Sequence, residues 1–176
     1  MNRGKKILIN IIILGILFFV FLRSTGLYLT PLAAHRASEK SIHYGPSKVV
    51  HIEDFPEGKY ILGKYDKWIS ANAVNKRLFF FWRFSDQVIG IENDLTKAIN
   101  ISHGLTGDNY KYYGIINDER IDKIEILLDN GKVLKETEFY EDMFIFVETG
   151  PNDKFAYVRN VKGYDLNDNV VYEEEF

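Results

Sequence analysis

The sequence predicts a mainly β protein in which an N-terminal transmembrane helix precedes an antiparallel β-sandwich. Three observations support this fold class. A continuous apolar run fills residues 7–22. Beyond residue 46, apolar residues recur with a period close to two, which is typical of half-buried strands. Turn-forming residues separate these segments at intervals of about eight to twelve residues, the spacing expected of strands in a sandwich.

The apolar run has the composition of a membrane-spanning segment. Its sixteen residues contain one polar side chain, Asn10, and one glycine, Gly15. As an α-helix it covers about 24 Å, slightly less than the roughly 30 Å hydrocarbon core of a bilayer. A polar residue inside a membrane helix often contacts a neighbouring helix. Asn10 is therefore a candidate contact with a partner in the membrane.

Basic residues flank the run and give it an orientation. Lys5 and Lys6 precede it and Arg23 follows it, so their charges extend outward while their stems stay in lipid. Because most of the positive charge precedes the run, residues 1–6 are expected in the cytoplasm. The expected arrangement is a single-pass signal anchor over residues 7–23 in the cell membrane, with the rest of the chain outside.

A cleaved signal peptide is the alternative interpretation of the same segment. The small residues that a signal peptidase needs are present at Leu32-Ala33-Ala34, and cleavage there would secrete the domain. However, the apolar run is at the long end for a signal peptide. Ala34 also lies twelve residues beyond the end of the run, with Arg23 in the interval. A retained anchor is the preferred interpretation.

Charge and cysteine content narrow the function classes. The net charge is −3, but residues 1–23 hold four basic and no acidic residues, so residues 24–176 carry −7. A mildly acidic body argues against binding to nucleic acid. The chain has no cysteine, which excludes disulfides, a thiolate zinc site and a cysteine-linked lipid anchor. An exported domain without disulfides favours a Gram-positive bacterial source.

Residues 24–42 are expected to form a juxtamembrane stalk. Thr30 and Pro31 have the character of an N-cap and a first helical residue. Gly45-Pro46 is a stop signal, so a short helix is expected over residues 32–41. Its apolar face is thin, which is why it is interpreted as a stalk.

An extracytoplasmic β domain is expected over residues 43–176. The apolar run at 78–84 is too short to span a membrane and is expected as a strand buried on both faces. Residues 93–109 are expected as a long loop and a candidate division of the domain, and Asn130-Gly131 indicates a type I′ hairpin turn. The expected strands are 49–52, 59–64, 68–74, 78–84, 88–92, 112–116, 121–128, 133–139, 143–148, 155–161 and 170–174.

Three segments carry a resemblance to known proteins: YGPSKVV at 44–50, LGKYDKW at 62–68 and YGIINDERI at 113–121. They resemble a group of small membrane-anchored surface proteins from Bacillus and its relatives, over a stretch from about Leu29 to the C-terminus. The pattern from Gly114 to Gly131 also resembles immunoglobulin-like (Ig-like) surface domains. The resemblance implies a surface ectodomain with an Ig-like sandwich, and it supplies no catalytic residues.

No arrangement of residues in the sequence indicates a metal site. The histidines are His35, His43, His51 and His103. No pair has the close spacing of a dedicated site, although Glu53 and Asp54 follow His51, so isolated strand or surface histidines are the better interpretation. Residues 165–169 begin like a calcium-binding loop but lack its glycine and final glutamate, and a hairpin turn explains them better. No metal ligand or cofactor is assigned.

The sequence also lacks an assembled catalytic motif. Ser102-His103-Gly104 is without the strand–turn–helix context of a nucleophile. The carboxylate pairs at 53–54 and 141–142 are adjacent, so on a strand they point to opposite faces. No catalytic residue is assigned.

Aromatic residues are candidates for a binding surface, although a sandwich core accounts for most of them. Tyr110 and Tyr112, at the edge of the expected loop, are the preferred candidates for contact with a partner. The preferred function is a non-enzymatic binding or interaction module for an envelope protein or wall component. Two alternatives stay open: an envelope hydrolase with a site made of scattered carboxylates, and a regulator that acts through the helix face bearing Asn10.

Overall fold

The computed structural model describes residues 3–85, 87–151 and 155–176. Over these residues the chain forms helices α1 (Arg3–Thr25) and α2 (Pro31–Ser41), followed only by antiparallel strands. The strands are β1 (Lys48–Phe55), β2 (Gly58–Tyr65), β3 (Trp68–Arg77), β4 (Phe81–Phe84), β5 (Gly90–Glu92), β6 (Ile99–Thr106), β7 (Asn109–Ile116), β8 (Lys123–Leu128), β9 (Val133–Glu136), β10 (Met143–Thr149), β11 (Val158–Tyr164) and β12 (Val170–Glu175).

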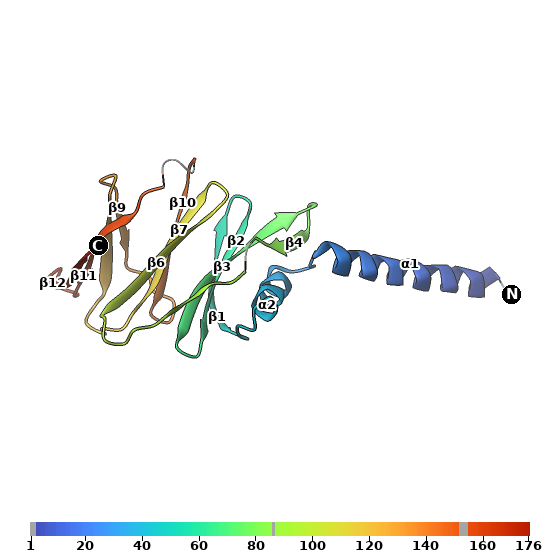
Figure 1. Ribbon diagram of the computed structural model, residues 1–176, viewed down its shortest axis with the longest axis horizontal. Coiled ribbons are helices and arrows are strands. Elements are labelled where there is room, and N and C mark those ends of the chain that lie inside the picture. The colour runs from blue at the N-terminus through green and yellow to red at the C-terminus, as the bar shows by residue number, and fades with distance from the viewer. Residues whose placement is uncertain (1–2, 86, 152–154) are drawn as a thin grey trace.

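The strands form three stacked sheets, which lead away from α1 as successive layers (Figure 1). The proximal sheet has the order β1-β2-β3-β4, with β5 also paired to β3. The middle sheet is β10-β7-β6, and the distal sheet is β12-β11-β8-β9. The predicted class, mainly β with an antiparallel sandwich behind an N-terminal apolar helix, is confirmed, and the sandwich is three sheets deep.

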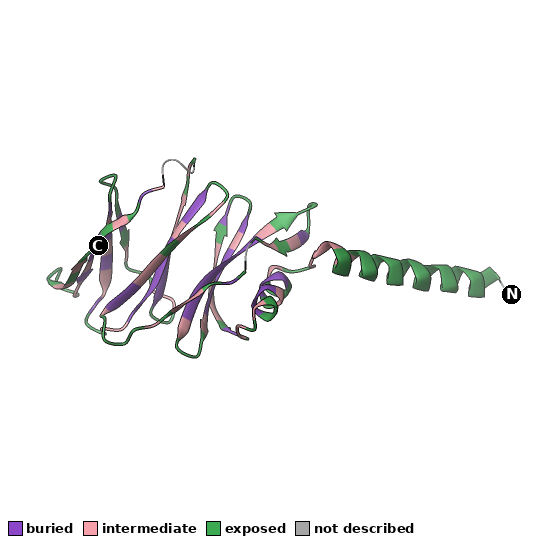
Figure 2. Cartoon of the chain, in the orientation of Figure 1, coloured by how far each residue is buried: buried purple, intermediate pink, exposed green. Residues whose placement is uncertain are grey.

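Helix α1 extends from the β domain with its apolar side chains exposed along its length (Figure 2). Among the described residues it is the one helix long and apolar enough to cross a membrane. Lys5, Lys6 and Arg23 are exposed near its two ends, and Asn10 is exposed within it. The expected apolar N-terminal helix is therefore present, and it contributes no buried residue to the domain.

Helix α2 begins as the sequence predicts but does not form a stalk. The Thr30 hydroxyl accepts a hydrogen bond from the Ala33 N–H at 3.1 Å, and Pro31 occupies the first turn. The helix lies on the outer face of the proximal sheet, where Ala34 packs with Ile61 and Val74. Residues 31–41 are thus part of the folded domain, because small and polar residues let the helix approach the sheet closely.

The middle sheet is buried on both faces, and the side chains of β7 pack alternately against the proximal and the distal sheet. Tyr113 and Ile115 point toward the proximal sheet, where they pack with Tyr60 and Leu62 of β2. Alternate residues of the same strand point to the distal sheet. A strand buried on both faces has no polar side, so its sequence is almost continuously apolar.

The distal sheet has one buried face and shows the clear alternation expected of such a strand. In β8, Ile124, Ile126 and Leu128 are buried and the residues between them are half-buried. The turn to β9 lies where the sequence predicts it. Its predicted type I′ conformation is wrong, because Gly131 is the residue of this turn with a positive φ (85°) and Asn130 is not.

Two predicted elements differ from the structure. Residues 93–109 are not one long loop, since β6 occupies 99–106 and pairs with β7 along its full length. The apolar run at 78–84 is not a strand buried on both faces. Only 81–84 is a strand, and residues 78–80 form the exposed turn between β3 and β4. Apolar composition alone does not reveal whether a segment has packing partners.

Candidate functional site

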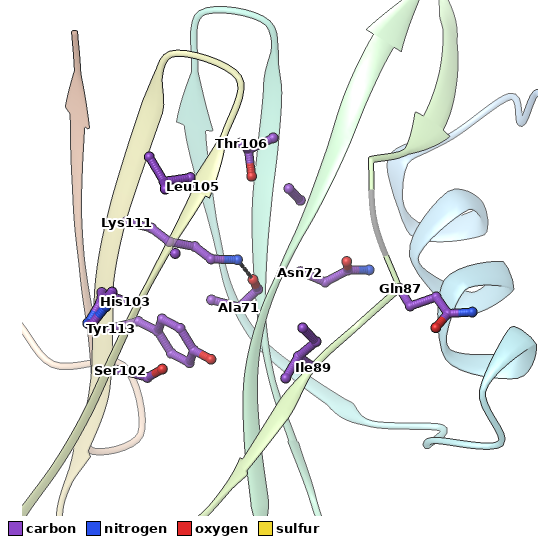
Figure 3. Close-up of a pocket in the computed structure, with 12 residues that line it drawn as sticks. Ala71, Asn72, Gln87, Ile89, Ser102, His103, Leu105, Thr106, Lys111 and Tyr113 are labelled. Carbon is purple, nitrogen blue, oxygen red and sulfur yellow. Dashed lines mark hydrogen bonds between the residues drawn. The ribbon is translucent and has the colours of Figure 1, made fainter. Parts of the chain in front are cut away.

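A partly enclosed cavity with polar and apolar lining lies where the edge of the proximal sheet is interrupted. Strand β4 pairs with residues 74–77 of β3, and β5 pairs with residues 68–70. Residues 71–73 therefore face no edge strand. We call this gap the notch (Figure 3).

Helix α2 helps to create the notch by holding the connecting segment away from β3. The Val88 N–H donates a hydrogen bond to the Ser38 hydroxyl of α2 at 2.9 Å, and the Val88 side chain is buried. The backbone N–H of Val88 is thus satisfied by the helix. The interruption of the sheet edge is a built feature of the fold.

Lys111 of β7 reaches across from the middle sheet into the notch. Its ammonium group donates a hydrogen bond to the Ala71 carbonyl of β3 (Figure 3). The same ammonium lies 5.0 Å from the ring centroid of Tyr60 and 5.6 Å from that of Tyr113. The Ser85 N–H donates to the Ala73 carbonyl at 3.1 Å. Side-chain and loop donors therefore replace a neighbouring strand at this edge.

The rest of the notch combines an apolar rim with a buried phenol. The cavity has a volume of about 210 Å³, and the exposed side chains of Ile89 and Leu105 lie on its rim. Burial raises the pKa of Tyr113, and its hydrogen bond with Ser102 offsets this in part. The phenol is therefore neutral at physiological pH. The notch is therefore lined by an ammonium group, a neutral phenol and strand backbone, and the Lys111 ammonium already binds the Ala71 carbonyl.

Ser102 and His103 do not form a catalytic pair. They are consecutive in β6, so their side chains point to opposite faces of the sheet. The His103 ring packs instead against Phe155 and Tyr157, with centroid distances of 5.3 and 5.6 Å. Burial lowers the pKa of His103, which keeps the ring neutral near pH 7.

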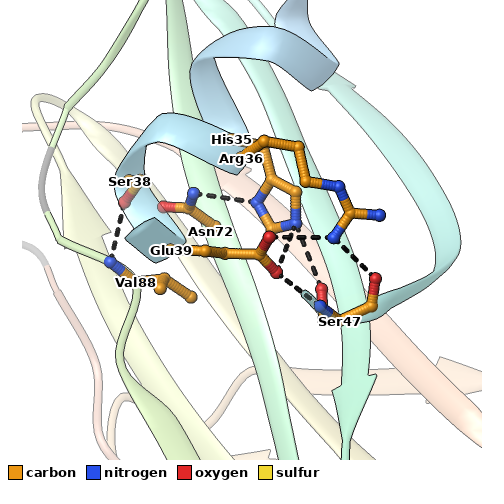
Figure 4. Close-up of polar contacts among 7 residues, drawn as sticks. All are labelled: His35, Arg36, Ser38, Glu39, Ser47, Asn72 and Val88. Atoms are coloured by element: carbon orange, nitrogen blue, oxygen red, sulfur yellow. Dashed lines mark hydrogen bonds and ion pairs between the residues drawn. The ribbon is translucent and has the colours of Figure 1, made fainter. Parts of the chain in front are cut away.

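A second polar arrangement, which we call the clasp, joins α2 to the proximal sheet (Figure 4). His35 and Glu39 lie one turn apart on α2, and the His35 Nε2 is 3.2 Å from both Glu39 Oε1 and Ser47 Oγ. The Asn72 amide of β3 lies 3.0 Å from His35 Nδ1. The Ser47 N–H donates to Glu39 Oε1 at 2.9 Å. Residues from three parts of the chain thus meet at one point.

Arg36 completes the charge balance of the clasp. Its guanidinium donates to Glu39 Oε2 at 2.8 Å and to the Ser47 carbonyl at 2.7 Å. Burial raises the pKa of Glu39, but hydrogen bonds from Ser47 and Arg36 outweigh this and lower it overall. Burial lowers the pKa of His35 more strongly than Glu39 raises it. The clasp therefore holds a carboxylate, a guanidinium and a neutral imidazole.

The clasp contains serine, histidine and glutamate, but its geometry is not that of a catalytic triad. In a triad the acid and the nucleophile bind opposite nitrogens of the histidine. Here Glu39 and Ser47 share Nε2, and Nδ1 faces Asn72. His35, Glu39 and Ser47 are also at most 2% exposed, so a substrate has no access to them. The clasp is a structural attachment of α2.

Gly45 fits closely against this attachment. Its φ of 87° lies in the left-handed region, and an added Cβ would approach the Glu39 carboxyl group to 2.9 Å. Both observations restrict the position to glycine.

The surface position predicted for Tyr110 and Tyr112 is wrong. Their side chains are 5% and 1% exposed, because alternate residues of β7 face the distal sheet. The Tyr110 hydroxyl donates to the carbonyls of Gly150 and Pro151, and the Tyr112 hydroxyl donates to the Ala156 carbonyl at 2.6 Å. Burial raises the pKa of Tyr112 to about 12, although the Ala156 hydrogen bond opposes the shift. These side chains pack in the core between the middle and distal sheets.

The remaining candidate ligands are placed separately. His51 Nε2 is 2.9 Å from Glu53, and its ring stacks on Tyr140 at 3.5 Å. Asp165 accepts hydrogen bonds from the Asn167 and Asn169 N–H groups at 2.9 Å, as in the hairpin turn that the sequence predicts. In residues 3–85, 87–151 and 155–176, no three histidine or carboxylate side chains are grouped so as to hold a metal ion.

Sequence reasoning missed the notch and the clasp. The i,i+4 spacing of His35 and Glu39 on a helix with little apolar surface was an available signal for a polar contact. The partners Ser47 and Asn72 were not, since only the fold brings them to the helix. Comparison with protein-family models, curated proteins and solved structures finds no match to the chain.

Proposed function

We propose that this is a single-pass membrane protein whose β domain lies outside the cell membrane and binds an extended segment of an envelope protein at the notch. The apolar helix α1 and its basic flanks Lys5, Lys6 and Arg23 support the anchor and its orientation. Attachment to a membrane suits a binding module, because it confines the module near its partners.

The packing of α2 supports retention of the anchor over cleavage after Ala34. Ala34 is fully buried and lies in the first turns of α2. Cleavage there would remove the Thr30 cap and create a charged amino group on His35, inside the clasp. A buried unpaired charge is strongly destabilising. Mass spectrometry of the mature protein should find residues 7–23 present, and an N-terminus at His35 would contradict the proposal.

The observation that carries the binding proposal is the interruption of the proximal sheet at residues 71–73. Exposed sheet edges commonly bind partners as an added strand, with backbone contacts for affinity and side-chain pockets for specificity. The notch is such an edge without a neighbouring strand, with Lys111 and Tyr113 behind it and Ile89 and Leu105 on its rim. Residues 71–73 are buried, and their outward carbonyls at Ala71 and Ala73 accept hydrogen bonds from Lys111 and Ser85, so a bound strand would take the place of these donors. A short extended peptide fits these groups better than a folded surface does, because the gap is three residues long.

Site-specific photo-cross-linking in intact cells tests the proposal. Since the chain has no cysteine, the full-length variants Gln87→Cys and Leu105→Cys place a single label on the notch rim. Leu166→Cys, on an exposed distal turn, is the matched control. We expect one discrete cross-linked species from both rim positions and not from the control.

Substitution of the notch adds a second readout. Ile89→Asp alters an exposed rim residue without touching the core, so it should abolish the cross-link from residue 105 while the protein level is unchanged. A cross-link that persists in Ile89→Asp, or that appears equally from residue 166, would show that the notch is not the binding site.

A further inference from the structure

The turn between β3 and β4 exposes three consecutive apolar side chains. Leu78, Phe79 and Phe80 are 61%, 91% and 60% exposed. Single exposed apolar residues are common on soluble proteins, but a projecting cluster of large ones is typical of a surface that contacts a protein or a membrane.

Local stability does not explain the residues of this turn. Leu78 and Phe79 have φ values of 43° and 66°, in the left-handed region. Bulky residues are rare there, whereas glycine and asparagine adopt it readily. Backbone strain of this kind is concentrated at positions with a function.

The turn lies at the end of the domain from which α1 departs (Figure 1). Tyr28, just after α1, and Trp82 of β4 exchange backbone hydrogen bonds of 2.8 Å each. The Phe81 ring lies 6.3 Å from the Phe18 ring of α1. Phe18 precedes Arg23 by five residues, or about 7.5 Å of helix. These contacts fix the turn beside the last turns of the apolar helix.

The charges beside the turn suit a membrane surface. Lys76 and Arg77 precede it and Arg83 follows it, all with exposed side chains. The sequence between Lys67 and Ser85 contains no acidic residue. Basic residues next to an apolar insertion bind the anionic headgroups of lipids while the apolar residues enter the interface.

We propose that Leu78, Phe79 and Phe80 insert into the outer leaflet of the membrane that holds α1, with the neighbouring basic residues on its anionic headgroups. This second contact fixes the tilt of the β domain and the direction in which the notch faces. It rests on the proposed anchoring by α1. The occupant is lipid and not a second copy of the chain, because Phe18 places the turn at the depth of the membrane-spanning helix.

The cysteine-free chain allows a direct test by spin labelling. Full-length variants Ile12→Cys, Phe79→Cys and Leu166→Cys carry one nitroxide each in vesicles of phosphatidylcholine and phosphatidylglycerol. Collision with oxygen reports lipid, and collision with a water-soluble nickel complex reports water. We expect residue 12 deep in lipid, residue 79 shallow in lipid and residue 166 in water. All three side chains are exposed, so folding is not disturbed.

The outcomes separate this proposal from the anchor itself. If the label at residue 79 is as accessible to nickel as that at residue 166 while residue 12 lies in lipid, the insertion is wrong and the anchor stands. Residue 12 in water overturns both. In nanodiscs that hold one chain each, protection of residue 79 should persist; if it requires several chains per disc, a second copy covers the turn and the lipid proposal is wrong.

Discussion

In the distal sheet, β8 alternates buried Ile124 and Ile126 with half-buried charged residues, and the turn to β9 has glycine at its positive φ. The end of the domain nearest α1 is different. Its β3–β4 turn has leucine and phenylalanine at positive φ, and α2 buries His35 and Glu39 against the proximal sheet.

This difference separates a region whose residues follow local preference from one whose residues do not. Residues chosen for stability agree with local preference and bury apolar surface, as in the distal sheet. The end nearest α1 departs from local preference in its turn and from apolar packing in its helix. Both departures lie at the end of the domain next to α1, and the proposed contact of this end with the membrane would account for the turn.

The largest effect should follow from breaking the clasp with Glu39→Leu. The substitution leaves the Ser47 N–H and His35 buried without their acceptor, which is expected to lower the free energy of unfolding by about 4 kcal/mol. The matched distal change, Glu125→Leu, removes a more exposed ion pair with Lys135 and should lower it by about 1 kcal/mol or less. Urea unfolding of the full chain in detergent, followed by the fluorescence of Trp68 and Trp82, measures both. If both substitutions lower the free energy of unfolding equally, the clasp stabilises the fold no more than an exposed ion pair does.

Truncation of the distal core should have a somewhat smaller effect. Ile126 is fully buried between the distal and middle sheets, so Ile126→Ala is expected to lower the free energy of unfolding by about 3 kcal/mol. Leu166→Ala, at an exposed position, should change it by less than about 0.5 kcal/mol. The same urea titration reports both values, and a loss at Ile126 no larger than at Leu166 would mean that the distal sheet unfolds independently of the tryptophans.

Substitutions in the β3–β4 turn and in the β8–β9 turn should change the free energy of unfolding in opposite directions. Leu78→Asn combined with Phe79→Gly relieves strain at positive φ and should raise the free energy of unfolding by about 1 kcal/mol in detergent. Gly131→Ala in the β8–β9 turn should lower the free energy of unfolding by about 1 kcal/mol, although the added methyl group meets no atom within 4 Å. If the double substitution destabilises the protein, the proximal turn is not strained and its residues need no functional explanation.

Acidification should weaken the clasp. Burial lowers the pKa of His35 in the folded state, so the unfolded chain binds this proton at higher pH than the folded one. Stability is therefore lost as the pH falls below about 6.5, the ordinary value for histidine, and the lowered pKa of Glu39 adds a further loss below about 4.5. His35→Gln should reduce the loss of stability below pH 6.5. The measurement is the urea midpoint of unfolding as a function of pH between 8 and 5.

His103→Gln is the comparison for that experiment. Burial lowers the pKa of His103 as well, but this residue lies in the middle sheet and has no link to α2. Substitution of His103 should remove only the His103 contribution to the pH dependence of stability and leave the His35 contribution in place. A profile unchanged by His35→Gln would contradict the assignment of pH dependence to the clasp.

The sequence predicted the elements whose structure is local or whose sheet has one solvent-exposed face. The strands β1 and β2, the Thr30 cap and the strand β8 were all predicted, since each depends on residues close in sequence. It failed for β7, where Tyr110 and Tyr112 looked like a loop edge. A strand covered on both faces shows no alternation from which its burial can be inferred.

The candidate sites depend on long-range pairing, which explains why they were not predicted. The notch forms because β4 and β5 pair with different parts of β3, and the clasp joins α2 to Ser47 and Asn72. The run at 78–84 was misjudged because residues 78–80 stay 60–91% exposed, although the Phe80 ring contacts that of Phe81. Apolar residues that face lipid and those that face a core have the same composition.

The return of β10 to the middle sheet has a consequence for biogenesis. The proximal sheet is complete at Glu92, but Met143 and Ile145, which cover its inner face with β7, follow about fifty residues later. At a synthesis rate of about 5–20 residues per second, that interval is roughly 3–10 s. The apolar face of the proximal sheet stays incompletely covered for that time, and under the proposed anchoring by α1 it does so beside the bilayer. Folding factors that work at the membrane surface therefore have a window of seconds in which to bind it.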